Sequence, residues 1–309
     1  MIRKNFEKDD SYFFRFIGIM LVVAAHYSNY MYEISGSKIW DLLNKLGRYG
    51  VALFFLVSGY GLTRSACVEG GGVDHCFILR RIRNVYLPFV IMQLLALIYL
   101  GVSGSQMNAK DWIFYFIGMD YWYILVIMCL YCCFYIAVKY FKKYNEFILF
   151  LLVSLLNTVL ALMGCEEWWY LTNYVFDLGV FLALHKGDDI ERKVNKELLV
   201  IISIIGFIVF SVFYAKIDEV LLHSVFKIMA ALCFAGFMWF FYELIPFHIC
   251  LKPLNYIGKS SLYIYVLHVQ ILNFMRKYNI RSWKVLVFSI PAVIMTAMLY
   301  EWILAKLIK

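Results

Sequence analysis

The sequence predicts an all-α integral membrane protein: a polytopic helical bundle of about ten transmembrane helices, with both termini cytoplasmic. Of its 309 residues, 63% are hydrophobic and 16% are charged, and the mean hydropathy is +0.75. A soluble domain is about a quarter charged, and a soluble globule this apolar would expose extensive apolar surface. Ten helices of about 20 residues each would leave only short loops. We therefore expect residues 1–309 to form a single membrane domain that itself carries the function.

Apolar runs separated by charged or turn-forming segments define the predicted spans in chain order. The spans are 13–32, 47–66, 84–101, 120–140, 146–163, 168–185, 197–215, 220–243, 256–275 and 284–306. The aromatic segment 111–119 is too short to cross a bilayer, so we expect it to lie at the interface before the fourth span. The first apolar run has no small-residue cleavage site, which argues against a cleavable signal peptide.

The distribution of positive charge gives the orientation. The net charge is +8, and basic residues are spread over many loops, which disfavours nucleic-acid binding. With the amino terminus inside, 19 Lys and Arg residues fall on the inner side, 9 fall on the outer side, and Lys227 lies within a span. This excess supports cytoplasmic termini. An odd number of spans would break the agreement.

The first span carries two polar residues that are costly in a membrane, Arg15 and His26. Eleven residues at 100° each bring both side chains to one face, roughly 16 Å apart along the axis. An arginine at the rim binds anionic groups well, and a buried histidine can accept a proton near neutral pH. The alternatives are an Arg15 that reaches lipid phosphates and a His26 that hydrogen-bonds a neighbouring helix.

Basic residues gather before the third span. The second span contains Gly50 and Gly59, which permit close helix approach, and the segment RRIRNVYLPF follows it. Ordinary positive-inside anchoring accounts for one or two of the arginines Arg80, Arg81 and Arg83. Three within four residues also suit a polyanionic ligand, because arginine binds phosphate in a bidentate manner.

Later spans contain further polar and aromatic candidates. Trp122 and Tyr123 open the fourth span, where interfacial aromatics are common. Ser261 and His268 are seven residues apart and lie about 20° from a common face of the ninth span. A pairing of Asp177 with Lys227 is open, because nothing in the sequence tests it. No metal-ligand spacing is present.

These motifs, in this order, resemble the membrane acyltransferase family 3, whose members O-acylate cell-surface carbohydrates and related acceptors. The resemblance covers nearly the whole chain, although the opening DDSYFFRFIG departs from the family's usual leucine- and alanine-rich start and the third arginine of the basic segment comes one place early. The matching segments are Arg15 with His26, GVALFFLVSGY at 50–60, RRIRNVYLP at 80–88, Trp122-Tyr123-Ile124 and GKSSLYIYVLH at 258–268.

The resemblance implies an O-acetyltransferase that uses cytoplasmic acetyl-CoA, or another acyl-CoA, as co-substrate, with no permanently bound cofactor and no metal. Arg15, Arg80, Arg81 and Arg83 would bind the phosphates, and His26 would be the general base. An acyl-histidine intermediate and direct transfer are both open. The residues expected to line the cavity or orient substrates are Ser58, Trp122, Tyr123, Ser261 and His268.

The expected acceptor is a surface glycan or its lipid-linked precursor, and the expected location is the cytoplasmic (inner) membrane, in contact with membrane lipid. The main alternative is a secondary transporter or flippase of a sugar or lipid-linked intermediate. Such proteins often have internal repeats and broken helices, and the sequence contains no repeat and only 4 prolines. A non-catalytic partner in an envelope-assembly complex would not need the Arg15–His26 stripe. The sequence does not indicate an oligomeric state.

Overall fold

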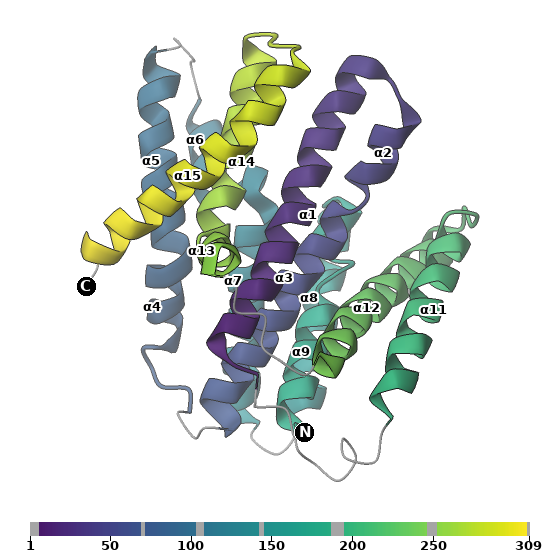
Figure 1. Cartoon of the computed structure of the whole chain (residues 1–309). Coiled ribbons are helices and arrows are strands. Elements are labelled where there is room, and N and C mark those ends of the chain that lie inside the picture. The colour runs from purple at the N-terminus through teal and green to yellow at the C-terminus, as the bar shows by residue number, and fades with distance from the viewer. Residues whose placement is uncertain are drawn as a thin grey trace.

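The computed structural model describes residues 6–68, 72–102, 108–141, 145–186, 195–245 and 252–307. Within these residues the chain forms helices and no strand, which confirms the predicted all-α bundle (Figure 1). The first half contains α1 (Lys8–Ser35), α2 (Lys38–Asn44), α3 (Gly47–Thr63), α4 (Phe77–Arg81), α5 (Leu87–Val102), α6 (Ala109–Ile117) and α7 (Trp122–Tyr140). The second half contains α8 (Asn145–Leu162), α9 (Tyr174–Leu184), α11 (Lys196–Tyr214), α12 (Val220–Leu244), α13 (Lys252–Lys259), α14 (Ser261–Lys277) and α15 (Trp283–Leu307).

Helix α3 forms the centre of the bundle, and 13 of its 17 residues are buried. Its glycines allow this position. A Cβ atom on Gly50 would lie 2.4 Å from the carbonyl oxygen of Gly18 in α1, and one on Gly59 would lie 2.2 Å from that of Phe176 in α9. Helix association in membranes depends on such close backbone approach, because lipid supplies no hydrophobic drive between helices.

The start of α1 is fixed by Asp10, one of the acidic residues at which the sequence departs from the usual opening of the family it resembles. The Glu7 backbone N–H donates to the Asp10 carboxylate at 2.7 Å, which forms half of a capping box. The Tyr242 hydroxyl, near the end of α12, donates to the other carboxylate oxygen of Asp10. Asp10, a charged residue at the start of an otherwise apolar helix, therefore connects α1 to α12.

The periphery of the bundle faces lipid. Helix α11 has no buried residue, although the mean hydropathy of its most apolar stretch is 2.5. It packs mainly along α12 (Figure 1), and Phe207 also contacts Tyr49 at the start of α3. On the opposite flank, α15 crosses in front of α14 beside α5. An apolar helix with no buried face is stable only in a bilayer.

Seven helices in the described part of the chain are long and apolar enough to cross a membrane, fewer than the ten predicted spans. Each of the other three predicted spans, 84–101, 168–185 and 256–275, contains a shorter helix. These helices are α5, α9 and α14, with 16, 11 and 17 residues. The segment before α9 forms a 3₁₀ turn instead, because buried Asn173 donates to Asn157 at 2.8 Å and to the carbonyl of Trp169.

Basic residues gather on the side of the bundle at which α1 begins, here called the N-terminal side. Lys186 and Lys196 both pair with Glu243 at the end of α12. Lys139, in the last turn of α7, lies 3.3 Å from the His75 ring in the loop before α4. The arrangement agrees with the predicted topology, in which this side faces the cytoplasm.

Candidate active site

A polar cavity of about 160 Å³ lies near the N-terminal side, between α1, α3, α7, α14 and the π-helical turn Ile82–Tyr86. It brings together four residues that the sequence singled out from four different helices: Arg15, Ser58, Tyr123 and Ser261. The remaining lining residues are Phe54, Asn84, Val85, Ile127, Tyr131, Lys259, Leu262, Tyr263 and Tyr265. The convergence of a few polar groups on one space is a feature of small-molecule sites.

The mouth of this cavity carries positive charge. Arg15 is partly exposed, and Lys259 and Asn84 are exposed. Lys259 forms an ion pair with Glu301 at 2.7 Å. Sequence reasoning counted Lys259 only as a topological charge. Its position two residues before Ser261 could have indicated that Lys259 lies close to the site.

Arg81 lies behind the mouth in a less solvated position. Its guanidinium lies over the rings of Phe77 and Tyr131, at 5.1 and 5.8 Å from their centroids, and Tyr131 lines the cavity. Burial lowers the pKa of Arg81, and the positive charges of Arg80 and Arg15 lower it further. The Arg81 Nε atom is buried with no hydrogen-bond partner. A half-desolvated guanidinium among other cations favours an anionic ligand.

Arg80 and Arg83 lie outside the cavity lining. Arg80 is exposed and donates two hydrogen bonds to Asp74, at 2.6 and 2.9 Å. This pairing holds the pKa of the Asp74 carboxyl below its usual range. Arg83 is exposed, one residue before Asn84 at the mouth. Arg80 and Arg81 are adjacent in α4 and therefore point in different directions, and Arg83 follows in the π-helical turn that starts at Ile82.

Deeper in the bundle, the two membrane histidines are in direct contact. The Nδ1 atom of His26 lies 2.6 Å from Nε2 of His268, and the rings stack with centroids 4.9 Å apart. His268 is fully buried, whereas His26 is partly exposed. The Nδ1 atom of His268 lies 2.8 Å from the carbonyl oxygen of Ile264, one turn earlier in α14. The helix-to-helix hydrogen bond that the sequence left open for His26 is therefore present.

Aromatic rings connect the cavity to the histidine pair. Tyr265 lines the cavity, and its ring lies 5.9 Å from the ring of His268 and 5.4 Å from that of Tyr123. The cationic mouth and the imidazoles thus lie at two ends of one stretch of packed side chains along α1 and α14. This arrangement agrees with the common face that helical spacing predicts for Arg15 and His26.

Gly258, the first residue of the segment GKSSLYIYVLH, allows α13 to lie close to α1. A Cβ atom on Gly258 would lie 1.9 Å from the carbonyl oxygen of Tyr12, so only glycine permits this contact. The contact places Lys259 and Ser261 beside the first turns of α1, where Arg15 lies. Trp122, in contrast, lies outside the cavity and packs against Trp169, with ring centroids 6.3 Å apart.

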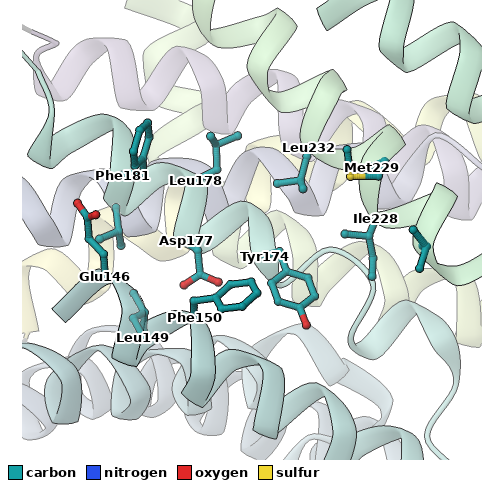
Figure 2. Close-up of a pocket in the computed structure, with 12 residues that line it drawn as sticks. Glu146, Leu149, Phe150, Tyr174, Asp177, Leu178, Phe181, Ile228, Met229 and Leu232 are labelled. Carbon is teal, nitrogen blue, oxygen red and sulfur yellow. The ribbon is translucent and has the colours of Figure 1, made fainter. Parts of the chain in front are cut away.

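A second cavity, of about 540 Å³, lies between α8, α9 and α12 and is lined almost entirely by apolar side chains. Figure 2 shows Asp177 among them, and both of its carboxyl oxygens are buried without a hydrogen-bond partner. The pairing of Asp177 with Lys227 that the sequence left open is absent, because Lys227 pairs with Glu167. None of the predicted site residues lines this cavity.

The fold is that of a multi-pass membrane protein, and within the bundle a polar cavity lined by Arg15 lies next to a pair of contacting histidines. The chain matches the family model described as an acyltransferase domain over residues 12–303. It therefore belongs to the membrane acyltransferase family 3, as its motifs predicted, and is an acyltransferase. Comparisons with curated proteins and with solved structures gave no match.

Proposed function

We propose that this protein transfers an acyl group, acetyl in the simplest case, from cytoplasmic acyl-CoA to a hydroxyl of a cell-surface carbohydrate or its lipid-linked precursor. The observations that support this most are the cationic mouth of the polar cavity and the histidine pair beside it, linked by Tyr265, whose ring lines the cavity and packs against His268. Acyl-CoA has the matching shape, with several phosphates at one end and a reactive thioester at the other. The predicted topology places the mouth on the cytoplasmic side, where acyl-CoA is available.

In this proposal the phosphates bind to Arg15 and Arg81, with the exposed Lys259 and Arg80 nearer solvent. The pantetheine and acyl thioester extend past Ser58, Tyr123 and Ser261. Arginine suits this role because its planar guanidinium binds phosphate oxygens in pairs. The small side chains of Ser58 and Ser261 leave room for a narrow chain and offer hydroxyl groups to its amides. The thioester then approaches the histidine pair beyond Tyr265.

His26 acts as the general base. The acceptor hydroxyl oxygen attacks the thioester carbonyl carbon, its proton passes to His26, the carbon–sulfur bond breaks, and the proton then passes to the departing CoA sulfur. The acceptor enters from the opposite side, where Glu33 and Arg276 form an ion pair at 2.9 Å beyond the histidines along α1 and α14. Two substrates that arrive from opposite sides need the catalytic group at mid-membrane depth.

Replacement of Arg15 or Arg81 by alanine is expected to weaken acyl-CoA binding about 10- to 100-fold, because each loses charge-assisted hydrogen bonds to phosphate. Calorimetric titration of the purified protein with acetyl-CoA measures this. Arg48→Ala is the matched control, because Arg48 lies on the opposite side of the bundle and contacts Lys45. Unchanged affinity in both variants would contradict the proposed mouth, and transport of a labelled lipid-linked sugar without acetyl-CoA consumption would favour the transporter alternative.

Asp74→Asn is expected to strengthen acetyl-CoA binding roughly two- to fivefold, because Asp74 competes with phosphate for Arg80 and an exposed pair of this kind is weak. Because the pKa of Asp74 is lowered in the folded protein, the pair persists as pH falls to the usual carboxyl range and is lost only below it. Titrations of wild type and variant at pH 5 and pH 7 should therefore show the same difference. Weaker binding by the variant would count against a phosphate role for Arg80.

A further inference from the structure

The hydrogen-bond chain behind His26 fixes which of its ring nitrogens is available for chemistry. The chain runs from the carbonyl oxygen of Ile264 to Nδ1 of His268, and from Nε2 of His268 to Nδ1 of His26. A carbonyl oxygen only accepts, so the Nδ1 atom of His268 must carry a proton. In a neutral imidazole the other nitrogen is then an acceptor.

It follows that His26 donates. Since Nε2 of His268 has only a lone pair to offer, the atom 2.6 Å away, Nδ1 of His26, must carry the proton. The bare nitrogen of His26 is then Nε2, on the far side of the ring from His268. The reverse tautomer of His26 would place two lone pairs against each other in a buried site, which is costly.

The burial of the two rings supports this division of roles. His268 is completely enclosed, so its ring reaches substrate only by way of His26. His26 is partly exposed. The ring of Tyr265 packs edge-on to His268 at 5.9 Å and restricts its rotation. His268 is therefore held on both sides, as a group must be if it is to orient another.

We propose that His268 is a positioning residue, rather than a substrate-binding residue, which holds His26 in the Nδ1–H tautomer and presents its Nε2 lone pair as the base. This inference rests on the proposed function of the same site. When His26 takes the acceptor proton at Nε2, its Nδ1–H bond to His268 becomes charge-assisted and stabilises the imidazolium. His268 keeps its own proton throughout, and no other proton moves. The third member of a serine protease triad acts in the same way through a carboxylate.

Two substitutions separate orientation from packing. His268→Phe keeps the ring shape but removes the acceptor, so the tautomer of His26 is no longer fixed. His268→Gln keeps an acceptor oxygen at a position close to that of Nε2. We expect kcat to fall about 10²- to 10³-fold in His268→Phe, and to stay within about tenfold of wild type in His268→Gln. The KM for acetyl-CoA should be unchanged in both variants.

The outcomes that overturn the inference are specific. If His268→Phe keeps wild-type kcat, or both variants lose activity equally, His268 does not act through a hydrogen bond to His26. A raised KM with unchanged kcat would instead make His268 a substrate contact. Thermal unfolding in detergent and acetyl-CoA binding by each variant verify that the comparison is made on folded protein.

Nitrogen NMR of protein labelled with ¹⁵N-histidine tests the tautomer without any substrate. Protonated and bare imidazole nitrogens have distinct chemical shifts, so the resting protein should show His26 with Nδ1–H and a bare Nε2, and His268→Phe should abolish that preference. A bare Nδ1 on wild-type His26 would overturn the inference whatever the reaction. If the NMR spectrum shows the expected tautomer but the protein transfers no acyl group, the inference about His268 stands and the proposed function is contradicted.

Discussion

Loss of the His26 imidazole is expected to lower acyl transfer by about 10³-fold or more, because general-base catalysis contributes on the order of 10²–10⁴. The other imidazole at the site, His268, is fully buried and does not reach the substrate directly. Two variants are needed. His26→Ala removes the whole ring but leaves Nε2 of buried His268 without its partner. His26→Asn keeps an N–H donor close to the Nδ1 position and removes only the basic nitrogen. Both should be inactive.

The readout for these variants is mass spectrometry of surface glycans from cells that carry each one, together with transfer by purified protein to an acceptor in vitro. His223→Ala is the matched control, since His223 lies in the first turn of α12 and contacts the Ile217 carbonyl at 3.0 Å, away from the cavity. Each variant must accumulate in the membrane and bind acetyl-CoA. Acyl groups on the glycans of His26→Asn cells would remove the catalytic role of His26.

Gly59→Ala is expected to destabilise the protein severely, by about 3 kcal/mol or more. The added Cβ would lie 2.2 Å from the Phe176 carbonyl oxygen, and a helix backbone cannot yield as a flexible side chain can. The two helices would have to separate along a contact that Gly179 tightens from the other side, where a Cβ would lie 2.2 Å from the Leu56 carbonyl oxygen. That separation exposes packing throughout the centre of the bundle.

Gly61→Ala is a sensitive control for this prediction. Gly61 lies two residues later in the same helix, and a Cβ there would meet no atom within 4 Å. The same chemical change should therefore leave stability unchanged or slightly raised, since alanine has the higher helix propensity. Yield of folded protein and the midpoint of thermal unfolding in detergent measure both variants. Equal stability of Gly59→Ala and Gly61→Ala would show that α3 and α9 do not approach this closely.

The family could be predicted from the sequence because its motifs are short. The relative positions of the residues within each motif follow from local helix geometry. Arg15 and His26 share a face of one helix whatever surrounds it, and helix geometry alone gives their separation. Trp122 shows the limit of that reasoning. Its position beside Tyr123 identifies the motif, but the helix turns Trp122 toward Trp169 and Tyr123 toward the cavity.

The contact between His26 and His268 could not be predicted from the sequence. Their separation of 242 positions carries no geometric information, and each histidine alone is compatible with a packing role. The roles of the three arginines were equally hidden. Arg80 is exposed and pairs with Asp74 from the preceding loop, while Arg81 lies against Tyr131 of α7.

The sequence by itself determined that this chain resides in a membrane and that helices make up nearly all of the chain. It also determined that Arg15 and His26 lie on one face of α1. Those properties follow from hydropathy and helical period, which are sums over neighbouring residues. Only the tertiary structure decided which side chains from α3, α7 and α14 complete the cavity, and which nitrogen of His26 is bare. Those depend on distances across helices, which glycines such as Gly50, Gly59 and Gly258 set by letting backbones touch.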